Sequence, residues 1–468
     1  MPNEIRKLNT SVPRGKSLSR RLAVRVALFI FCCVSPGCAW YSAVDEPLEQ
    51  WTEAESERTW QQFTGERSAE LAVMLAFSGG GTRAAALSYG VLKELSEIDV
   101  ATHSGTRSLL DEVDVISSVS GGSFTAAYFG LHGEQTFADF EERFLRRDVQ
   151  WVLFRQWFNP VNWFKLLSQA YGRSDLAAEY YDKILFEGAT LKDLESPGAP
   201  LLLINTTDLA TGARFPLLRD YFGMICADFN SYPVSRAVAA SSAVPVILPP
   251  ITLESFAGDC GFQEPQWVSE ALKQPGLPQS KIAAKLIEEY QDRKQRPWLH
   301  LVDGGVSDNL GLRAFYNAVS ISDEPGNRLS LLRNREAQHF LIISVNAYAK
   351  KTSSWVLERY SPSLFEVARA VSADQIVRYS DDTVEIVRDS FQNWIAEQST
   401  PERPMSFHFV NVGFRQVEDE KEREFLNLIG TSFDLSDEEV DRLIAAARKV
   451  LRESPEFKKF LQVVSSGE

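Results

Sequence analysis

Three stretches of this chain combine residue types that could carry chemistry, and each directly follows an apolar run. The first is Ser78-Gly79-Gly80-Gly81-Thr82-Arg83. Successive glycines let the backbone approach a ligand closely, and their amides, together with the start of a following helix, can face an anion. Two other interpretations stay open here. One is a tight turn that only lets a helix pack on a strand, and the other is a dinucleotide fingerprint over Gly79–Ala84.

The second and third stretches supply a hydroxyl and a carboxylate. Ser118-Val119-Ser120-Gly121-Gly122 has the small-x-Ser-x-Gly pattern of a nucleophile elbow, where a sharp turn lifts a serine hydroxyl out of the sheet edge. Asp303-Gly304-Gly305 places an acid at the C-terminal end of another strand, which we expect to be parallel, so that the acid points into the crevice where α/β proteins bind ligands. Each could also be an ordinary turn, since Ser, Gly and Asp are common turn residues.

A serine nucleophile needs a base, and the choice of base limits the chemistry. The chain has five histidines, and none lies in a glycine-rich loop after a strand. His300 is three residues before Asp303, so in a strand the two side chains face opposite sides. A Ser120–Asp303 dyad is therefore the simplest hypothesis. It requires burial to raise the aspartate pKa, which is about 3.9 in water.

These loops must be positioned by a core, and the apolar pattern predicts one. Short, continuous apolar runs predict strands that are buried on both faces. They are Leu71–Phe77, Val113–Val119, Pro200–Asn205, Trp298–Val302 and Phe340–Asn346. Helical stretches lie between them, such as Arg83–Leu95 and Thr125–His132. The alternation predicts a three-layer α/β/α sandwich with a mostly parallel central sheet.

The rest of the chain divides into a front and a tail. The tail from residue 351 to residue 468 predicts a mainly helical extension packed on the catalytic domain, with one strand at Ser406–Val412. Its Ser436-x-x-Glu439 is a capping box that starts a helix. We expect a leader over residues 1–38, a linker helix over residues 39–68 and a catalytic domain over residues 69–350.

The three loops together resemble the patatin-like phospholipases in order and spacing, over roughly residues 70–320. Thr207–Gly212 and Ala239–Pro250 add to the resemblance. It implies a patatin-like α/β fold and a lipid acyl hydrolase of the phospholipase A or lysophospholipase type, without metal or cofactor. The implied nucleophile is Ser120 and the implied base is Asp303. The implied oxyanion hole is Gly79, Gly80 and Gly81 with Arg83 nearby, and the implied elbow neighbours are Ser118, Gly121 and Gly122.

Departures from the family pattern and other functions bear on this hypothesis. Ser78 stands where the family often has Asp, Ala84 where it often has Gly, and Ser118 where the elbow usually has Gly. These differences bear more on the range of substrates than on catalysis, because none of them is at the implied nucleophile, base or oxyanion donors. A dinucleotide-binding protein would need an acid where the second strand ends in Ser117–Ser120. An inactive lipid-binding envelope protein and an acyltransferase using the same dyad stay open, as does the oligomeric state.

Charge separates the front of the chain from the rest. The formal net charge is −14, but residues 1–38 hold seven basic side chains and one acid, which leaves the rest at −20. Such a body is a poor partner for nucleic acid. Basic residues, the apolar run Val26–Val34 and the small residues that end at Cys38 indicate an export signal, and Cys38 is a lipidation candidate. We therefore expect a cell-envelope protein, periplasmic or attached to a membrane, although an uncleaved anchor is an alternative.

Three further features leave their roles open. Cys226 and Cys260 could pair in an exported protein, or remain buried thiols. Trp151–Phe164 holds six aromatic residues, which suits either a membrane interface or a helix buried against the sheet. Ser280–Lys294 is rich in charge and predicts a solvated surface helix.

Overall fold

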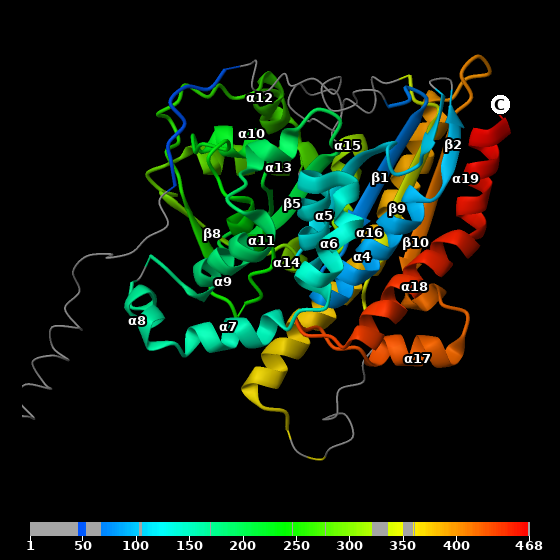
Figure 1. Ribbon diagram of the computed structural model, residues 1–468. Coiled ribbons are helices and arrows are strands. Elements are labelled where there is room, and N and C mark those ends of the chain that lie inside the picture. The colour runs from blue at the N-terminus through cyan, green and yellow to red at the C-terminus, as the bar shows by residue number, and fades with distance from the viewer. Residues whose placement is uncertain are drawn as a thin grey trace, which may run out of the picture.

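The computed structural model describes residues 45–52, 67–102, 105–168, 170–245, 247–276, 278–320, 336–349, 359 and 361–466. Its centre is an eight-stranded sheet with the order β10-β9-β1-β4-β5-β8-β7, and β6 pairs with β5 beside this path (Figure 1). The strands are β1 Leu71–Phe77, β4 Val113–Val119, β5 Leu201–Asp208, β6 Arg214–Pro216, β7 Ile251–Glu254, β8 Trp298–Asp303, β9 His339–Asn346 and β10 Ser406–Gly413. A separate hairpin joins β2 Asp99–Thr102 and β3 Gly105–Ser108.

Each predicted strand is present, but one runs in a direction that the sequence did not indicate. Strands β10, β9, β1, β4 and β5 are parallel, whereas β8 is antiparallel to β5. The prediction that Asp303 ends a parallel strand is therefore wrong. Strand β5 extends to Asp208, beyond the level where β4 ends at Val119, and β8 pairs with this overhang from the opposite direction. Asp303 thereby lies opposite Thr206, at the end of the sheet where β4 stops.

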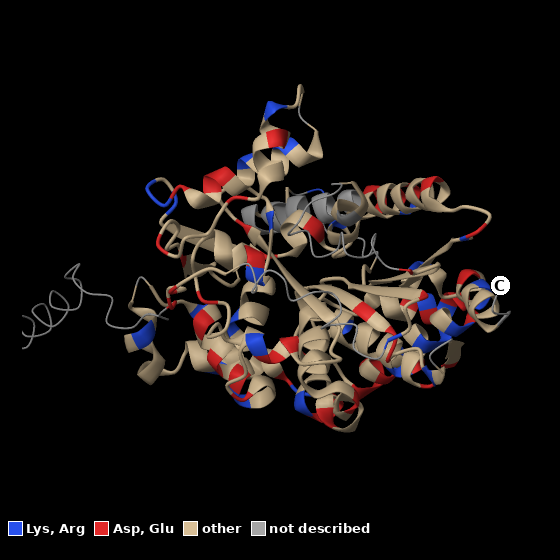
Figure 2. Ribbon diagram, turned by 90° about the horizontal axis from the view of Figure 1, so that it is seen from above, with Lys and Arg blue, Asp and Glu red and all other residues tan. Residues whose placement is uncertain are grey.

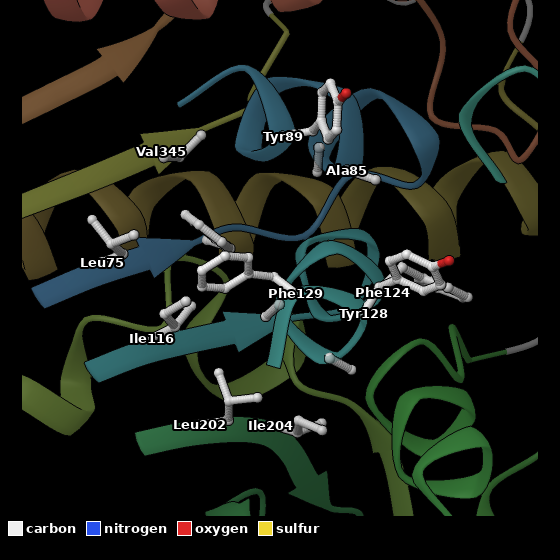
Figure 3. Close-up of a cluster of buried hydrophobic side chains, with 14 of the residues drawn as sticks. Leu75, Ala85, Tyr89, Ile116, Phe124, Tyr128, Phe129, Leu202, Ile204 and Val345 are labelled. Carbon is white, nitrogen blue, oxygen red and sulfur yellow. The ribbon is translucent and has the colours of Figure 1, made fainter. Parts of the chain in front are cut away.

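Strand β1 shows how the sequence divides between two layers. Its alternate residues Leu71, Val73, Leu75 and Phe77 join one hydrophobic cluster, while Ala72, Met74 and Ala76 join a second cluster. Side chains alternate between the faces of a strand, so a continuous apolar run is buried on both sides. Figure 3 shows the first cluster, to which strands contribute Leu75 and Ile116 and helices contribute Tyr89 and Phe124.

Helices cover both faces of the sheet, which confirms the predicted three-layer α/β/α architecture (Figure 1). The positions of charged residues, red and blue on the ribbon of Figure 2, lie largely on these outer helices. The helices are α4 Thr82–Ser96, α5 Gly121–His132, α6 Thr136–Phe140, α7 Val149–Trp157, α8 Pro160–Leu166, α9 Arg173–Tyr181, α10 Arg219–Met224, α11 Val234–Ser241, α12 Gln266–Lys273, α13 Gln279–Gln291, α14 Gly305–Asp308, α15 Arg313–Ser320, α16 Leu364–Gln398, α17 Glu420–Leu428, α18 Asp437–Glu453 and α19 Pro455–Ser466.

The C-terminal part of the chain is built into the same sheet. Strand β10 pairs in parallel with β9 along its length, so this part extends the sheet at its edge as well as packing on it. Helix α18 begins at the predicted capping box and lies against α4. Gly90 of α4 allows this approach, because a β-carbon there would lie 2.8 Å from the Ala447 methyl group. Across the same contact, the buried Glu94 accepts hydrogen bonds from arginines of α18.

The front of the chain is described only in part. Residues 45–52 are not helical, so the expected linker helix does not include them; the other residues of the range 39–68 that precede Arg67 lie outside the described part. Leu48 and Trp51 instead donate their backbone amides to the carbonyls of Cys226 and Cys260. The leader and Cys38 lie outside the described residues. Within the described part of the chain, no helix combines the length and apolar character that crossing a bilayer requires.

The two body cysteines form a disulfide. Cys226 and Cys260 are buried and their α-carbons are 5.4 Å apart. The bond ties the loop after α10 to the loop after β7, next to the segment 45–52. The alternative of two buried free thiols is therefore wrong for this structure.

Candidate active site

Ser120 lies at a sharp turn between β4 and α5. Its backbone has φ 50° and ψ −119°, a region that residues with a β-carbon rarely occupy. Such strain persists only where the surrounding structure holds the residue in place, and it is found at functional sites. Strand β4 and helix α5 are both buried, so they hold the turn from either side. The residue pattern of a nucleophile elbow thus has the matching backbone geometry.

The elbow and the glycine loop touch backbone to backbone. A β-carbon at Gly121 would collide with the carbonyl group of Gly81, and one at Gly122 would lie 2.8 Å from the carbonyl oxygens of Phe77 and Ser78. Glycine is therefore required at both positions by close approach. This contact brings the loop after β1 beside Ser120, whose β-carbon lies 3.3 Å from the position that a Gly79 β-carbon would take.

Asp303 is held next to Ser120 in a buried position. The Ser120 side chain lies close enough to the Asp303 carboxyl group to favour its charged form, and the amide of Gly305 donates to Asp303 Oδ1 at 2.7 Å. Asp303 is only 7% exposed. Burial, which disfavours the charged form, raises its pKa to about 6, although the Gly305 amide and the Ser120 side chain oppose the shift. A base with this pKa is ionised near neutral pH and still accepts a proton readily.

The three loop glycines are not equivalent as donors. The amide of Gly79 already donates to the carbonyl of Asn309 at 3.0 Å, so the expected role of Gly79 as an oxyanion donor does not fit this structure. Among the described residues, the amides of Gly80 and Gly81 have no protein acceptor. Gly81 has φ 63° and directly precedes α4, so its position combines a free amide with the positive end of a helix.

Arg83 acts through the C-terminal part of the chain. Its guanidinium group donates to the Ile429 carbonyl at 2.6 Å and to Thr431 Oγ1 at 3.1 Å. Next to these residues, the Ser432 carbonyl accepts the amide of Thr82 at 2.9 Å. Burial lowers the pKa of Arg83 to about 10, which leaves it charged. Arg83 therefore positions the 429–432 loop against the glycine loop, and its hydrogen bonds do not point to a direct oxyanion role.

A buried polar network beneath the elbow escaped the sequence analysis. The amide of Ser120 donates to Ser241 Oγ at 2.9 Å, and Ser241 Oγ donates to the Asn205 carbonyl at 2.7 Å. Ser123 Oγ links Ser241 Oγ to Ser118 Oγ at 3.0 and 3.1 Å. The serine that replaces the usual elbow glycine, Ser118, thus takes part in this network. A polar end to the apolar strand β5 was the one signal that could have revealed it.

The backbone of Asp303 is fixed by two neighbouring elements. Its amide donates to the Ala243 carbonyl at 3.0 Å, and its carbonyl accepts from Thr207 Oγ1 at 2.9 Å. His300 lies on the other face of β8, where its Nδ1 is 3.0 Å from Thr252 Oγ1. The structure therefore brings Ser120 and Asp303 together and keeps His300 apart, as the alternation of side chains along a strand requires.

One family model and several solved structures are similar to this chain. A family model described as patatin-like phospholipase matches residues 75–316, about half of the chain. Human GIVD cytosolic phospholipase A2 is 14% identical, with 92% of this chain and 69% of that chain covered and a TM-score of 0.44. Its complex with methyl gamma-linolenyl fluorophosphonate is 15% identical, with 91% of this chain and 66% of that chain covered and a TM-score of 0.42. VipD from Legionella pneumophila is 11% identical, with 90% of this chain and 71% of that chain covered and a TM-score of 0.28. No curated protein matches.

Because Asp303 carries a buried charge, we expect that removing this charge raises the stability of the fold by an amount that depends on pH. The pKa of Asp303 in the folded chain is about 6, against 3.8 ordinarily. The folded chain therefore binds a proton at Asp303 more tightly than the unfolded chain does. The stability that this proton contributes to the fold is complete below pH 3.8 and is lost as pH rises through 6. Asn cannot lose a proton, so Asp303→Asn should be more stable than the parent by up to roughly 3 kcal/mol at pH 7.5, and by little at pH 4. Urea unfolding at both pH values measures this difference.

Asp419→Asn is the matched control for that measurement. Asp419 caps the start of α17. Its carboxylate accepts a hydrogen bond from the Glu422 amide, and this bond lowers the pKa of Asp419. Its charge stabilises the fold above the unfolded pKa, so its removal should cost stability at pH 7.5 and not at low pH. A stability difference for Asp303→Asn that fails to grow with pH would contradict a buried, charged Asp303.

Proposed function

Because this chain belongs to the patatin-like phospholipase family, we propose that it is a lipid acyl hydrolase that cleaves carboxylic esters with a Ser120–Asp303 dyad. The observation that carries the proposal is the pairing of a serine at a strained elbow with a neighbouring buried aspartate of raised pKa. The free amides of Gly80 and Gly81 support it, since ester cleavage needs donors for a developing oxyanion.

The first half of the reaction forms an acyl-enzyme. Ser120 Oγ bonds to the ester carbonyl carbon while its proton moves to the Asp303 carboxylate. The carbonyl oxygen takes on negative charge, which the amides of Gly80 and Gly81 stabilise; each such donor contributes about 3–4 kcal/mol in comparable sites. The carbon–oxygen bond to the alcohol then breaks, and the leaving alkoxide takes the proton from Asp303.

The second half of the reaction releases the acyl group. Water attacks the ester bond between Ser120 and the acyl chain, and its proton passes to Asp303. Collapse of this intermediate breaks the bond to Ser120 Oγ, which regains the proton as the fatty acid leaves. Asp303 thus serves both steps as a base and then as an acid, so a pKa close to neutral favours the complete cycle.

Replacement of the nucleophile tests the dyad directly. Ser120→Ala removes the attacking oxygen, so hydrolysis of phospholipid, lysophospholipid and p-nitrophenyl butyrate should fall by at least about 10³-fold. Labelling of the intact protein by a fluorophosphonate should be lost in the same variant. The measurements are initial rates and the mass of the labelled protein.

Ser269→Ala serves as the control, because this serine is exposed on α12 and bonds only to its own helix. It should retain full activity and labelling. Persistent full esterase activity in both Ser120→Ala and Asp303→Asn would show that the dyad is assigned wrongly. Labelling of Ser120 without turnover of any of the three esters would instead favour a lipid-binding protein.

The pKa of Asp303 predicts the pH dependence of the reaction. The base must be ionised to accept the serine proton, so kcat/KM should rise about tenfold per pH unit below about pH 6 and level off by about pH 7.5. An uncharged substrate such as p-nitrophenyl butyrate restricts the titration to the enzyme. A flat profile between pH 5 and pH 8 would exclude Asp303 as the essential base.

We also propose that the protein is exported to the cell envelope. The leader pattern of residues 1–38 supports this, and so does the Cys226–Cys260 disulfide, since such bonds persist in oxidising compartments. Intact mass spectrometry of protein from membrane and periplasmic fractions should show loss of the leader. If Cys38 is the lipidated first residue, Cys38→Ser should remove an added lipid mass. Retention of the complete basic leader in every molecule would contradict cleavage.

A further inference from the structure

Helices α7 and α8 carry an exposed aromatic surface. We define it by seven large apolar side chains that are 45–75% exposed: Trp151, Phe154, Phe158, Val161, Trp163, Phe164 and Leu167. The alternative that this stretch is a helix buried against the sheet is therefore wrong. Exposed apolar side chains gathered in one segment mark an interaction site more often than chance, whereas scattered ones need no explanation.

Helix α7 is apolar on two sides, and only one side is covered. Val149 and Leu153 are buried against the body of the protein, which anchors the helix. Trp151, Phe154 and Phe158 recur at helical spacing on the outward side. Their rings pack on one another, stacked for Trp151 and Phe154 and tilted for Phe154 and Phe158, with ring centroids 5.9 and 4.6 Å apart. Val149 and Leu153 thus anchor α7, while its row of aromatic rings points away from the core.

Helix α8 presents its apolar residues with still less cover. It has seven residues, and none of them is buried. Asn159 caps its start, where the Asn159 side chain accepts a hydrogen bond from the amide of Val161. The Trp163 ring nitrogen donates to the Trp157 carbonyl at 3.3 Å, which fixes α8 relative to α7. A helix this short gains little stability from its own hydrogen bonds. Its exposed rings are therefore placed to be covered by something outside the described part of the chain.

The charge of this segment fits a phospholipid surface better than the rest of the chain does. Residues 149–174 include three basic side chains and no acid, in a chain with 63 acids and a net charge of −14. Arg155 is exposed within the aromatic surface, and Arg173 lies over the Trp157 ring at 5.2 Å. Trp and Phe beside basic residues suit the boundary between headgroups and acyl chains, where acids would be repelled by anionic lipids.

Both ends of this segment are tied to loops that flank the dyad. At its start, Gln150 donates its amide to the Phe433 carbonyl, next to the Ser432 that contacts the glycine loop. At its end, Ser174 donates to the carbonyl of Pro249, in the loop that begins where Ala243 holds Asp303. Figure 1 shows α7 and α8 at the lower left of the molecule.

Other exposed apolar side chains lie on the same side as the dyad. Val306 follows Asp303 by three residues and is 45% exposed, and Val244 and Ile247 are exposed in the loop after Ala243. Apolar contacts therefore flank the dyad on the side of Asp303 as well as along α7 and α8.

We propose that the aromatic surface is where this protein docks on a phospholipid bilayer, so that ester bonds of membrane lipids enter at the edge that holds Ser120. This inference rests on the proposed function for its substrate. Vesicle binding is independent of catalysis, so the two can fail separately. The bilayer takes the place of the missing cover on α7 and α8, with the rings at the headgroup level and Arg155 toward lipid phosphates.

The test compares two double variants of the full chain. Trp163→Ala/Phe164→Ala removes exposed rings from α8, where no residue is buried. Ile282→Ala/Leu428→Ala is the matched control, since these side chains are 48% and 71% exposed on other helices. We measure binding to phosphatidylcholine–phosphatidylglycerol vesicles with the Ser120→Ala change also present, and hydrolysis of vesicle lipid and of soluble p-nitrophenyl butyrate without it.

The expected result is selective. The α8 variant should lose at least tenfold in vesicle binding and in hydrolysis of vesicle lipid, while its rate on p-nitrophenyl butyrate stays within twofold. The control pair should keep all three within twofold. Equal loss on both substrates would indicate a structural defect and overturn the proposal. Full vesicle binding by an inactive parent would leave docking intact and reject the proposed function alone.

A second measurement does not depend on how strongly the leader itself binds. Vesicles with brominated acyl chains should quench part of the tryptophan fluorescence of the parent. The conservative change Trp151→Phe/Trp163→Phe should remove that quenched part and retain binding, whereas Trp298→Phe, at another exposed site, should not. Unchanged quenching would overturn the proposal. So would light scattering that shows a dimer of the parent and a monomer of the α8 variant with vesicle binding intact, because the surface would then join two copies.

Discussion

The contact between two glycine backbones is the constraint on which the site depends. The elbow after β4 and the loop after β1 can touch only because Gly121 has no β-carbon to collide with the carbonyl of Gly81. Adjacent parallel strands end at the same edge of the sheet, so the loops that follow them meet there. Their contact places a strained Ser120 beside the free amides of Gly80 and Gly81. The order of β1 and β4 in the sheet is thus directly linked to the chemistry.

The second requirement is a buried base, and it reduces stability. Asp303 reaches Ser120 because β8 runs back along the overhang of β5, and this position removes the carboxylate from water. Burial disfavours the charged form, so the ionised Asp303 that catalysis needs at neutral pH costs the folded chain stability relative to the unfolded chain. The surrounding fold offsets this cost, in part through the C-terminal strand and helix that extend the sheet and pack on α4. Stability elsewhere therefore sustains a destabilising group at the site.

Much of the fold and part of the site could be predicted from residue patterns. The apolar runs predicted β1 and β4 to the residue, because strands buried on both faces read as continuous apolar segments. Ser120 and Asp303 could be named for the same reason, since they follow such runs. The direction of β8 could not, because an apolar run has no polarity until it is paired. Nor could the loss of Gly79 as a donor, which follows from its bond to Asn309.

By itself, the sequence determined which groups are available for chemistry: a serine and an aspartate after buried strands, glycines where backbones must meet, and a segment rich in rings and free of acids. Only the tertiary structure decided which of them meet. It brought Asp303 to Ser120, assigned Arg83 to the C-terminal loop and left the rings of α7 and α8 uncovered. The physical reason is that burial and hydrogen bonding depend on partners that are far away in the chain. A pattern along the chain records what each residue can do, whereas its neighbours in space decide what it does.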